Sequence, residues 1–305
     1  MGGSPTLRAG SDAILLPVRR AVDRAAFRRR LRGVASGRLE KQALQLGPAP
    51  DEALSLLTAE CRPLLVGAPS LRRLTAALER SGELGSILDG LDSRDREVQL
   101  RSARLLGALR LEVAVPWLET LLANRHRRLR SAAARALGRI SGVRAANALV
   151  RGLGWRRGST ARLAIELARA SPDLYLEAGL ADPRLRRIRA SLALALGLRR
   201  RRSGLPALLA LLESGNRTER VVSARAIGWL KADAAGAALV YALGDPDWQV
   251  RNAATKAIGP LTGVAESEIS VGLMDRNARV RRTASDVIRL RWRLASQVPG
   301  GPRWR

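Results

Sequence analysis

The residue types that most often perform chemistry are scarce in this sequence. His126 is the only histidine and Cys61 is the only cysteine, and the two lie in different regions. His126 stands between arginines, whose charge favours the neutral imidazole, and Cys61 follows an apolar segment, where a thiol is typically buried. The sequence has no glycine-rich nucleotide loop, zinc pattern or calcium loop. We therefore expect no catalytic residue, no metal site, no cofactor and no small-molecule substrate, which favours a protein that is not an enzyme.

Asp245 and Asp247, which flank Pro246, are the best candidates for a pair of acid–base carboxylates. The pair Asp182-Pro183 has the same layout earlier in the chain. An Asp-Pro pair that recurs is typical of helix starts, with the aspartate as the cap and the proline in the first turn. We therefore predict that Asp245 caps a helix rather than acting in catalysis.

Arginine is the remaining chemically active residue type, and it is abundant. The formal net charge is +27, and only Lys41, Lys231 and Lys256 of the 54 basic residues are lysines. Because abundant Arg, Ala and Gly together are also typical of a GC-rich genome, the positions of the arginines are more informative than their number. They gather in short groups along the chain, at 94–96, 125–130, 156–157, 184–189, 217–220, 251 and 276–282.

These groups recur because the sequence around them recurs. The segment VRNAATKAIG, from Val250, has related copies that start at residues 98, 129, 160, 188, 219 and 280. With the first residue of each copy counted as position 0, positions 0, 4, 7 and 8 are mostly apolar or small, which predicts one buried face of a helix. Glycine at position 9 in five copies predicts the end of that helix. A second apolar segment precedes most copies, so each repeat predicts helix A, an arginine-bearing turn and helix B.

Two copies carry a resemblance to a known family: DPDWQVRNAATKAIG, from Asp245 to Gly259, and NRHRRLRSAAARALG, from Asn124 to Gly138. They resemble the short HEAT-like repeats first associated with phycobilisome lyases, and are similar to generic bacterial HEAT-repeat proteins. The resemblance implies an all-α fold, an α-solenoid of about seven HEAT-like helix pairs over residues 84–292. We expect a basic helical N-terminal cap at 1–83, where segments 51–60 and 69–81 could be degenerate repeats, and a disordered tail at 293–305.

The basic segment 18–36 has two interpretations. A helix at a membrane surface or against a partner is one, because Val18, Ala21, Val22 and Ala25 would share a face. That face is short, so we favour a helix that caps the solenoid.

Equivalent turns of a solenoid lie along one edge, so the arginine groups predict a basic edge. The resemblance implies that the arginine at position 1 pairs with an acidic residue of an adjoining repeat. Position 1 is held by Arg130, Arg189, Arg220, Arg251 and Arg281, and the expected partners are Asp95, Asp182, Asp247 and Asp275. The other arginines and the tryptophans of the same turns are the predicted binding residues: Arg127, Arg128, Trp155, Arg157, Arg186, Arg187 and Trp248.

We therefore predict a non-enzymatic scaffold or adaptor that binds a protein partner. The alternative is binding of nucleic acid or an anionic membrane surface along the basic edge. It includes a HEAT-like DNA glycosylase, for which Asp247 beside Trp248 would be the active pair. A phycobilin-lyase-like protein is the third hypothesis. No apolar run approaches the ~20 residues of a membrane span. A bacterial cytoplasmic protein, with peripheral binding at the inner membrane surface as an option, is expected.

Overall fold

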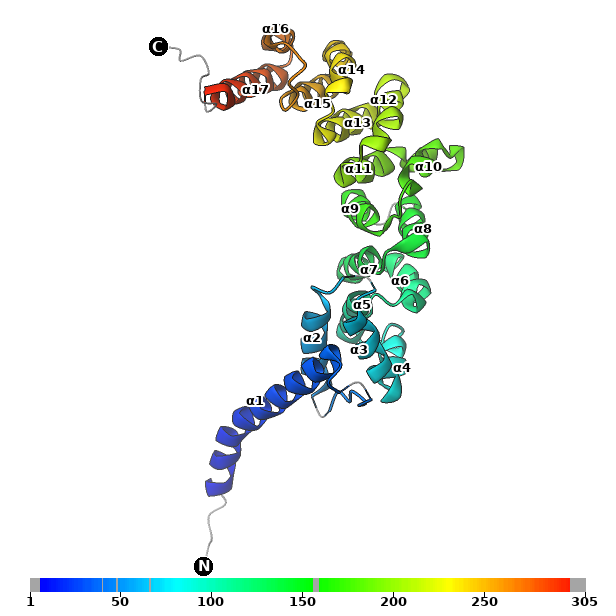
Figure 1. Cartoon of the computed structure of the whole chain (residues 1–305), viewed down its shortest axis with the longest axis vertical. Coiled ribbons are helices and arrows are strands. Elements are labelled where there is room, and N and C mark those ends of the chain that lie inside the picture. Colours follow the sequence, from blue (N-terminus) through cyan, green and yellow to red (C-terminus); the bar gives the residue numbers. More distant parts are fainter. Residues whose placement is uncertain (1–5, 40, 48, 66, 156–158, 297–305) are drawn as a thin grey trace, which may run out of the picture. The chain divides into compact units, whose positions relative to one another are not determined.

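The computed structural model describes residues 6–39, 41–47, 49–65, 67–155 and 159–296, and within them the side chains from residue 21 to 294. Every regular element in these ranges is a helix, so the predicted all-α solenoid is confirmed (Figure 1). The chain forms two compact units, Met1–Ala148 and Leu149–Arg305, with the boundary inside one helix, α8 (Gly142–Gly154). No helix in the described part is long and apolar enough to cross a membrane.

The seven sequence copies form the B helices. Each B helix begins within two residues of the predicted start of its copy. The B helices are α5 (Arg96–Leu109), α7 (Arg127–Ile140), α9 (Thr160–Ala170), α11 (Arg189–Arg199), α13 (Arg217–Leu230), α15 (Trp248–Ile258) and α17 (Ala278–Ser296).

An A helix precedes each B helix and is shorter than it in every repeat except that of α8 and α9. In the second unit α10, α12, α14 and α16 form one layer, and the B helices form the other (Figure 1). The prolines Pro116 and Pro206 lie in the first turns of two A helices, as predicted. The A helices are α4 (Glu83–Asp89), α6 (Val115–Leu122), α8, α10 (Tyr175–Ala181), α12 (Leu205–Ser214), α14 (Gly236–Tyr241) and α16 (Glu266–Ser270). Short 3-10 helices flank them at Glu112–Ala114 (η1), Pro183–Ile188 (η2), Arg202–Gly204 (η3), Asp233–Ala235 (η4), Ala242–Gly244 (η5) and Val271–Met274 (η6).

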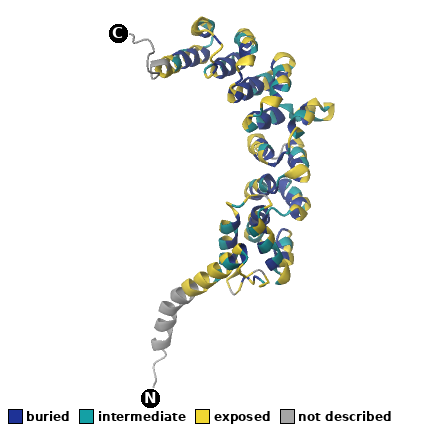
Figure 2. Cartoon of the chain, in the orientation of Figure 1, coloured by how far each residue is buried: buried dark blue, intermediate teal, exposed yellow. Residues whose placement is uncertain are grey.

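The core lies between these layers and is built from leucine and alanine (Figure 2). In α15 the residues at positions 0, 4, 7 and 8 are Val250, Ala254, Ala257 and Ile258, and all four are buried. Alanine at positions 4 and 7 leaves room for a neighbouring helix to approach closely. The predicted buried face is therefore confirmed.

The glycine at position 9 ends helix B in α15, where Gly259 follows the last helical residue, Ile258. In α5, α7, α11 and α13 it does not, so that prediction is wrong for four of the five copies. Gly228 lies inside α13, and the chain leaves the helix three residues later, at Lys231, which has a φ of 49°. Arg110, Ser141 and Arg200 occupy the equivalent position with φ of 59°, 58° and 52°. The glycine serves packing instead, because a Cβ on Gly228 would lie 2.8 Å from Cα of Ala257 in the next B helix.

Three helices precede the repeats: α1 (Thr6–Ser36), α2 (Pro50–Cys61) and α3 (Pro69–Arg80). Among the described side chains of α1, Leu31, Val34 and Ala35 are buried in the unit, while nearly all of residues 21–30 are exposed (Figure 2). Arg24 nevertheless pairs with Glu52 of α2 at 3.2 Å. At the other end α17 continues past residue 292, and the rest of the predicted tail, residues 297–305, lies outside the described residues.

Candidate functional site

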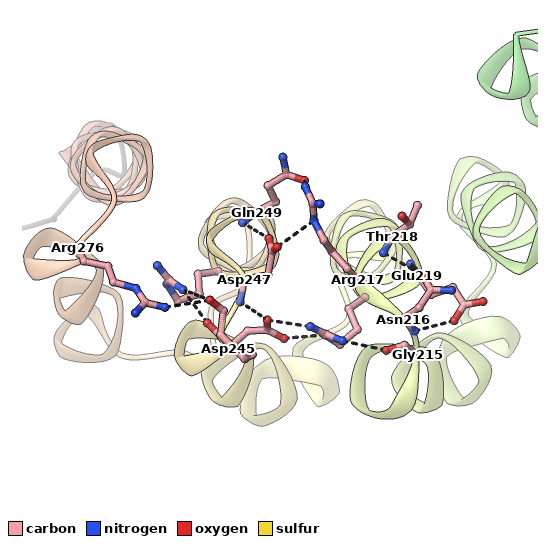
Figure 3. Close-up of polar contacts among 12 residues, drawn as sticks. Gly215, Asn216, Arg217, Thr218, Glu219, Asp245, Asp247, Gln249 and Arg276 are labelled. Carbon is pink, nitrogen blue, oxygen red and sulfur yellow. Dashed lines mark hydrogen bonds and ion pairs between the residues drawn. The ribbon is translucent and has the colours of Figure 1, made fainter.

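Ion pairs connect neighbouring AB turns, the turns between helices A and B, in the second unit (Figure 3). Arg220 binds both carboxylate oxygens of Asp245, at 2.8 Å from Nε and 3.1 Å from Nη2. Arg251 binds Asp275 in the same way, at 2.7 and 3.0 Å. Such a bidentate geometry fixes the orientation of both side chains, so these two pairs are rungs between adjacent repeats.

Each rung carboxylate also organises its own turn. The backbone N–H of Asp247 donates to Asp245 Oδ1 at 2.8 Å, and that of Asn277 donates to Asp275 Oδ1 at 2.7 Å. The residue whose N–H donates to the rung carboxylate is itself the cap of helix B. Asp247 shows this, because its own carboxylate accepts a hydrogen bond from Gln249 N. The prediction that Asp245 is the cap is therefore wrong, because the cap lies two residues later and Asp245 holds the arginine.

The same offset explains why most of the predicted partners are wrong. Asp95, Asp182 and Asp247 each accept a 2.8 Å bond from the N–H two residues ahead, as helix caps do. Asp247 also makes an ion pair at 2.9 Å, but with Arg217 rather than with a position-1 arginine. Of the four predicted partners, only Asp275 forms a rung.

Two of the remaining position-1 arginines, Arg130 and Arg281, bind carbonyl groups rather than carboxylates. Arg130 donates to the carbonyls of Asn124 and Arg125, at 2.9 and 2.7 Å, and Arg281 donates to those of Asp275 and Arg276. Each rung aspartate stands two residues before the cap of helix B. That place is held by Ser214 in the repeat after Arg189, and by Arg157, which lies outside the described residues, in the repeat after Arg130. No carboxylate therefore stands at the rung position, and Arg189 Nε is buried without a hydrogen-bond partner in the described part of the chain.

The predicted binding residues of the second unit lie in or next to these turns. Arg186 and Arg187 are exposed in η2, and neither forms an ion pair with a described residue. Trp155 is 39% exposed. Trp248 is half-buried, with the guanidinium of Arg279 at 5.2 Å from its ring centre, a cation–π contact. Arg157 lies outside the described residues.

In the first unit Arg127 and Arg128 are exposed at the start of α7. Arg128 pairs with Glu97 at 3.4 Å, and both side chains are largely in solvent, so this pair adds little stability. His126 precedes them as the N-cap residue, and its pKa is lowered by partial desolvation and by the nearby charges of Arg96, Arg125 and Arg130. The prediction of a neutral imidazole agrees with this direction.

A second surface of the second unit was not predicted from the sequence. We call it the B-face, and it consists of exposed residues at positions 6 and 10 of the B helices: Leu198, Arg225, Trp229, Lys256, Asp286 and Leu290. The apolar members are all at position 10 and the basic members at position 6, which lie on one side of a helix. Trp229 packs over α11, since a Cβ on Gly197 would lie 3.1 Å from its Cε3.

A groove of about 400 Å³ continues the B-face between α15 and α17. Lys256 and Leu290 line it, together with Arg279, Arg282 and Asp286. Its two walls are joined by a 2.7 Å hydrogen bond from the Thr283 hydroxyl to Asn252 Oδ1. The groove is thus a fixed hollow with more basic than acidic side chains.

A comparison with known protein families agrees with this architecture of helix pairs and recurring B helices. The sequence profile of HEAT repeats matches residues 85–169, 175–259 and 205–289, more than half of the chain. The chain belongs to the HEAT-repeat family. A search of curated proteins finds no match.

Several solved structures of HEAT- and armadillo-type repeat proteins are similar to this chain. Human deoxyhypusine hydroxylase in complex with glycerol is 19% identical, with 81% of this chain and 100% of the other covered and a TM-score of 0.36. A designed armadillo repeat protein is 16% identical, with 68% and 99% covered and a TM-score of 0.35. Another, in complex with the peptide (KR)4, is 16% identical, with 80% and 94% covered and a TM-score of 0.25.

The residues that the sequence offered for catalysis or metal binding have structural surroundings in this fold. Cys61 is fully buried at the end of α2, and burial, followed by the charge of Glu60, raises the pKa of its thiol to about 12. Asp247, considered for a glycosylase, is held by Gln249 N and Arg217 as the cap of α15. No group of three or more potential metal-ligating acids, histidines or cysteines occurs in the described part of the chain.

Sequence reasoning also missed arginines near the C-terminal ends of the B helices. The Arg291 guanidinium donates to the carbonyls of Ile258, Gly259, Leu261 and Val264, and Arg110 and Arg199 bind carbonyls near other helix ends in the same manner. These arginines satisfy carbonyl groups that a helix end leaves free. A usable signal was available for the B-face, since Leu198, Trp229 and Leu290 share position 10, off the predicted buried face.

Proposed function

We propose that this HEAT-repeat chain is a non-enzymatic scaffold that binds a protein partner through the B-face of its second unit. The observation that carries the proposal is the row of exposed apolar side chains Leu198, Trp229 and Leu290 beside the cations Arg225 and Lys256. Aromatic, aliphatic and basic groups in one patch are the chemistry of a protein-binding hot spot. The partner that fits is a segment with apolar and acidic residues.

Three further features support a binding role. The exposed edge arginines Arg127, Arg128, Arg186 and Arg187 add positive charge that would attract an acidic partner, with Trp155 and Trp248 as added contacts in the same turns. The groove between α15 and α17 offers a hollow on the B-face. Cys61 is buried, and burial raises the pKa of its thiol to about 12, which favours a packing role for this side chain.

The test is capture of a partner by the full chain from a lysate treated with nuclease. We expect L198A/W229A to weaken binding of the captured protein by about thirtyfold or more, the loss of a hot spot worth about 2 kcal/mol. Tyr241→Ala is the matched control, because Tyr241 is 86% exposed on an A helix away from the B-face. Equal binding by both variants, with both folded, would contradict the proposed face.

Nucleic-acid binding along the basic edge is the second candidate function. The observation in its favour is that Arg127, Arg186 and Arg187 are exposed and form no ion pair with a described residue. Binding that nuclease abolishes, with a steep dependence on salt, would favour it over the scaffold. A bacterial cytoplasmic location, with peripheral association at the inner membrane surface, belongs to the proposal, and the phycobilin-lyase hypothesis rests on the repeat resemblance alone.

A further inference from the structure

A basic hollow lies on the N-terminal cap, far in sequence from the B-face. Its volume is about 810 Å³, and it is lined by Arg28, Arg29 and Arg32 of α1 and by Arg38 after the helix. The other lining residues are Ala25, Gly33, Ser36 and Leu39. No acidic residue lines the hollow, and none of the four arginines forms an ion pair with a described residue.

Two glycines fold the chain back so that Arg38 joins the arginines of α1. Gly37 has a φ of 88°, and Leu39 N then donates to Gly33 O at 3.0 Å. Gly33 permits this return, because a Cβ there would lie 2.5 Å from Leu39 Cδ1. The turn is tied to its unit by Arg73, whose Nη1 donates to Ala35 O at 3.2 Å. The fourth guanidinium is therefore placed at the hollow by a fixed turn.

Stability of α1 does not account for this cluster. Arg28 and Arg32 are four residues apart and Arg29 and Arg32 three apart, spacings at which like charges destabilise a helix. The last turn of α1, where basic residues would favour the helix dipole, contains none. All of these arginines are exposed, so removing them uncovers no core. The cluster is better explained by a ligand whose negative charge offsets the repulsion between the guanidinium groups.

We propose that this hollow binds the phosphate backbone of duplex nucleic acid. Guanidinium groups bind phosphate oxygens through two parallel hydrogen bonds, and all four cations here are arginine. The hollow is open, and the exposed residues 21–30 extend from it along α1, so a polymer can pass through and continue along the helix. Recognition by charge alone matches sequence-independent contact with a duplex.

Other anionic partners fit the hollow less well. A single strand needs aromatic rings for its unstacked bases, and none lines the hollow. A membrane-surface helix needs a broad apolar face, whereas Val22 is the one large exposed aliphatic residue of α1 among its described side chains. A protein partner needs apolar anchors, and Leu39 alone is large and apolar in the lining.

The test measures binding of the full chain to a fluorescent DNA duplex of about 20 base pairs at several salt concentrations. The hollow variant is R28Q/R29Q/R32Q/R38Q, which changes all four arginines that line the hollow. The control, R62Q/R72Q/R104Q/R135Q, removes the same charge from exposed arginines of the first unit that lie outside both the hollow and α1. Melting temperature is measured for each, and the double variant R28Q/R29Q serves if the fourfold variant is unstable.

We expect the hollow variant to bind DNA at least about tenfold more weakly, with a salt slope reduced by about 0.9 for each lost phosphate contact. The control variant should keep most of its affinity for DNA. Equal losses in both variants would overturn the proposal in favour of net charge. An unchanged affinity of the folded hollow variant for DNA would also overturn the proposal. So would binding of the wild type to vesicles of phosphatidylcholine and phosphatidylglycerol but not to DNA, which would indicate a membrane site instead.

Discussion

At the scale of single residues, one side-chain type has several structural roles in this chain. Arg251, like Arg220, has two of them: its Nη1 donates to the carbonyls of Asp245 and Pro246, while Nε and Nη2 bind Asp275. Arg291 closes the end of α15 instead. The planar guanidinium, with five donors in a fixed fork, can satisfy several acceptors at once, which an ammonium group cannot do with the same geometry. Much of the positive charge is therefore committed to the fold.

We expect Arg251→Ala to destabilise the protein by about 3–5 kcal/mol, because it leaves the carboxylate of Asp275 buried without its partner. The side chains of the pair are 7% and 9% exposed. Chemical denaturation measures the loss. Arg282→Ala is the control, since Arg282 is an exposed neighbour of the same turn, and it should change the unfolding free energy by less than about 0.5 kcal/mol. Similar small effects of both variants would show that the rung is not needed.

The rung also predicts how stability depends on pH. The bonds from Arg251, followed by the Asn277 N–H and nearby arginine charges, hold the pKa of Asp275 below its usual 3.8. The folded chain therefore binds this proton less tightly than the unfolded chain. The stabilisation is fully present above pH 3.8 and is lost as the pH falls through the lower folded pKa.

In Asp275→Asn this contribution is absent at every pH. The difference in unfolding free energy between wild type and variant should thus shrink as the pH is lowered below 3.8, as followed by urea denaturation at a series of pH values. A difference that stays constant in acid would mean that the carboxylate is not stabilised by the rung.

At the scale of elements, the B helices α5, α11 and α13 are each defined by two backbone positions rather than one. Position 9 is where neighbouring B helices touch, so it is glycine, and position 12 is where the chain leaves the helix with a positive φ. The usual association of glycine with helix ends makes one residue suggest both functions. In this repeat the close contact takes the glycine, and the ending falls on residues such as Arg200 and Lys231, where a side chain is strained.

This division predicts opposite effects for two nearby substitutions in α13. Gly228→Ala should destabilise by about 1–3 kcal/mol, because its Cβ would press on the backbone of Ala257. Lys231→Gly should stabilise by up to about 1 kcal/mol by releasing the positive φ. Urea midpoints of the two variants measure both changes. If position 9 were the helix stop instead, Lys231→Gly would bring no gain.

The repeat could be predicted from the sequence, whereas its connections could not. Periodic apolar positions such as Val250 and Ala254 fix which side of a helix is buried, so the helix pairs and their starts followed from the pattern. The rung partners depend on a shift of two residues between Asp245 and Asp247, both acidic and both near the turn. Only three-dimensional geometry separates the residue that caps from the residue that pairs. The B-face was missed because the periodic pattern was used only to find the buried face, although Leu198, Trp229 and Leu290 share position 10.

At the scale of the whole molecule, the repeats offer two surfaces with different chemistry. The AB-turn edge carries exposed arginines beside aspartates that cap helices or form rungs, whereas the B-face joins apolar anchors to basic residues. Long-range charge mainly accelerates the encounter with a partner, while buried apolar contact mainly slows its dissociation. A scaffold that uses both surfaces should therefore show separable kinetic effects when either is changed.

The combined variant with Arg127, Arg128, Arg186 and Arg187 changed to Ala tests the edge. We expect its melting temperature to stay nearly intact, because these side chains are exposed and the one ion pair among them, Arg128 with Glu97, lies in solvent. With an acidic protein partner, association measured by surface plasmon resonance should slow while dissociation stays the same, whereas L198A/W229A should speed dissociation. If the partner were a nucleic acid bound at the edge, the combined variant would reduce the salt slope by about 0.7–0.9 for each lost phosphate contact. An edge variant that binds every partner at the wild-type rate in low salt would leave the B-face as the one binding surface of the repeats, and the edge arginines as charge without a binding role.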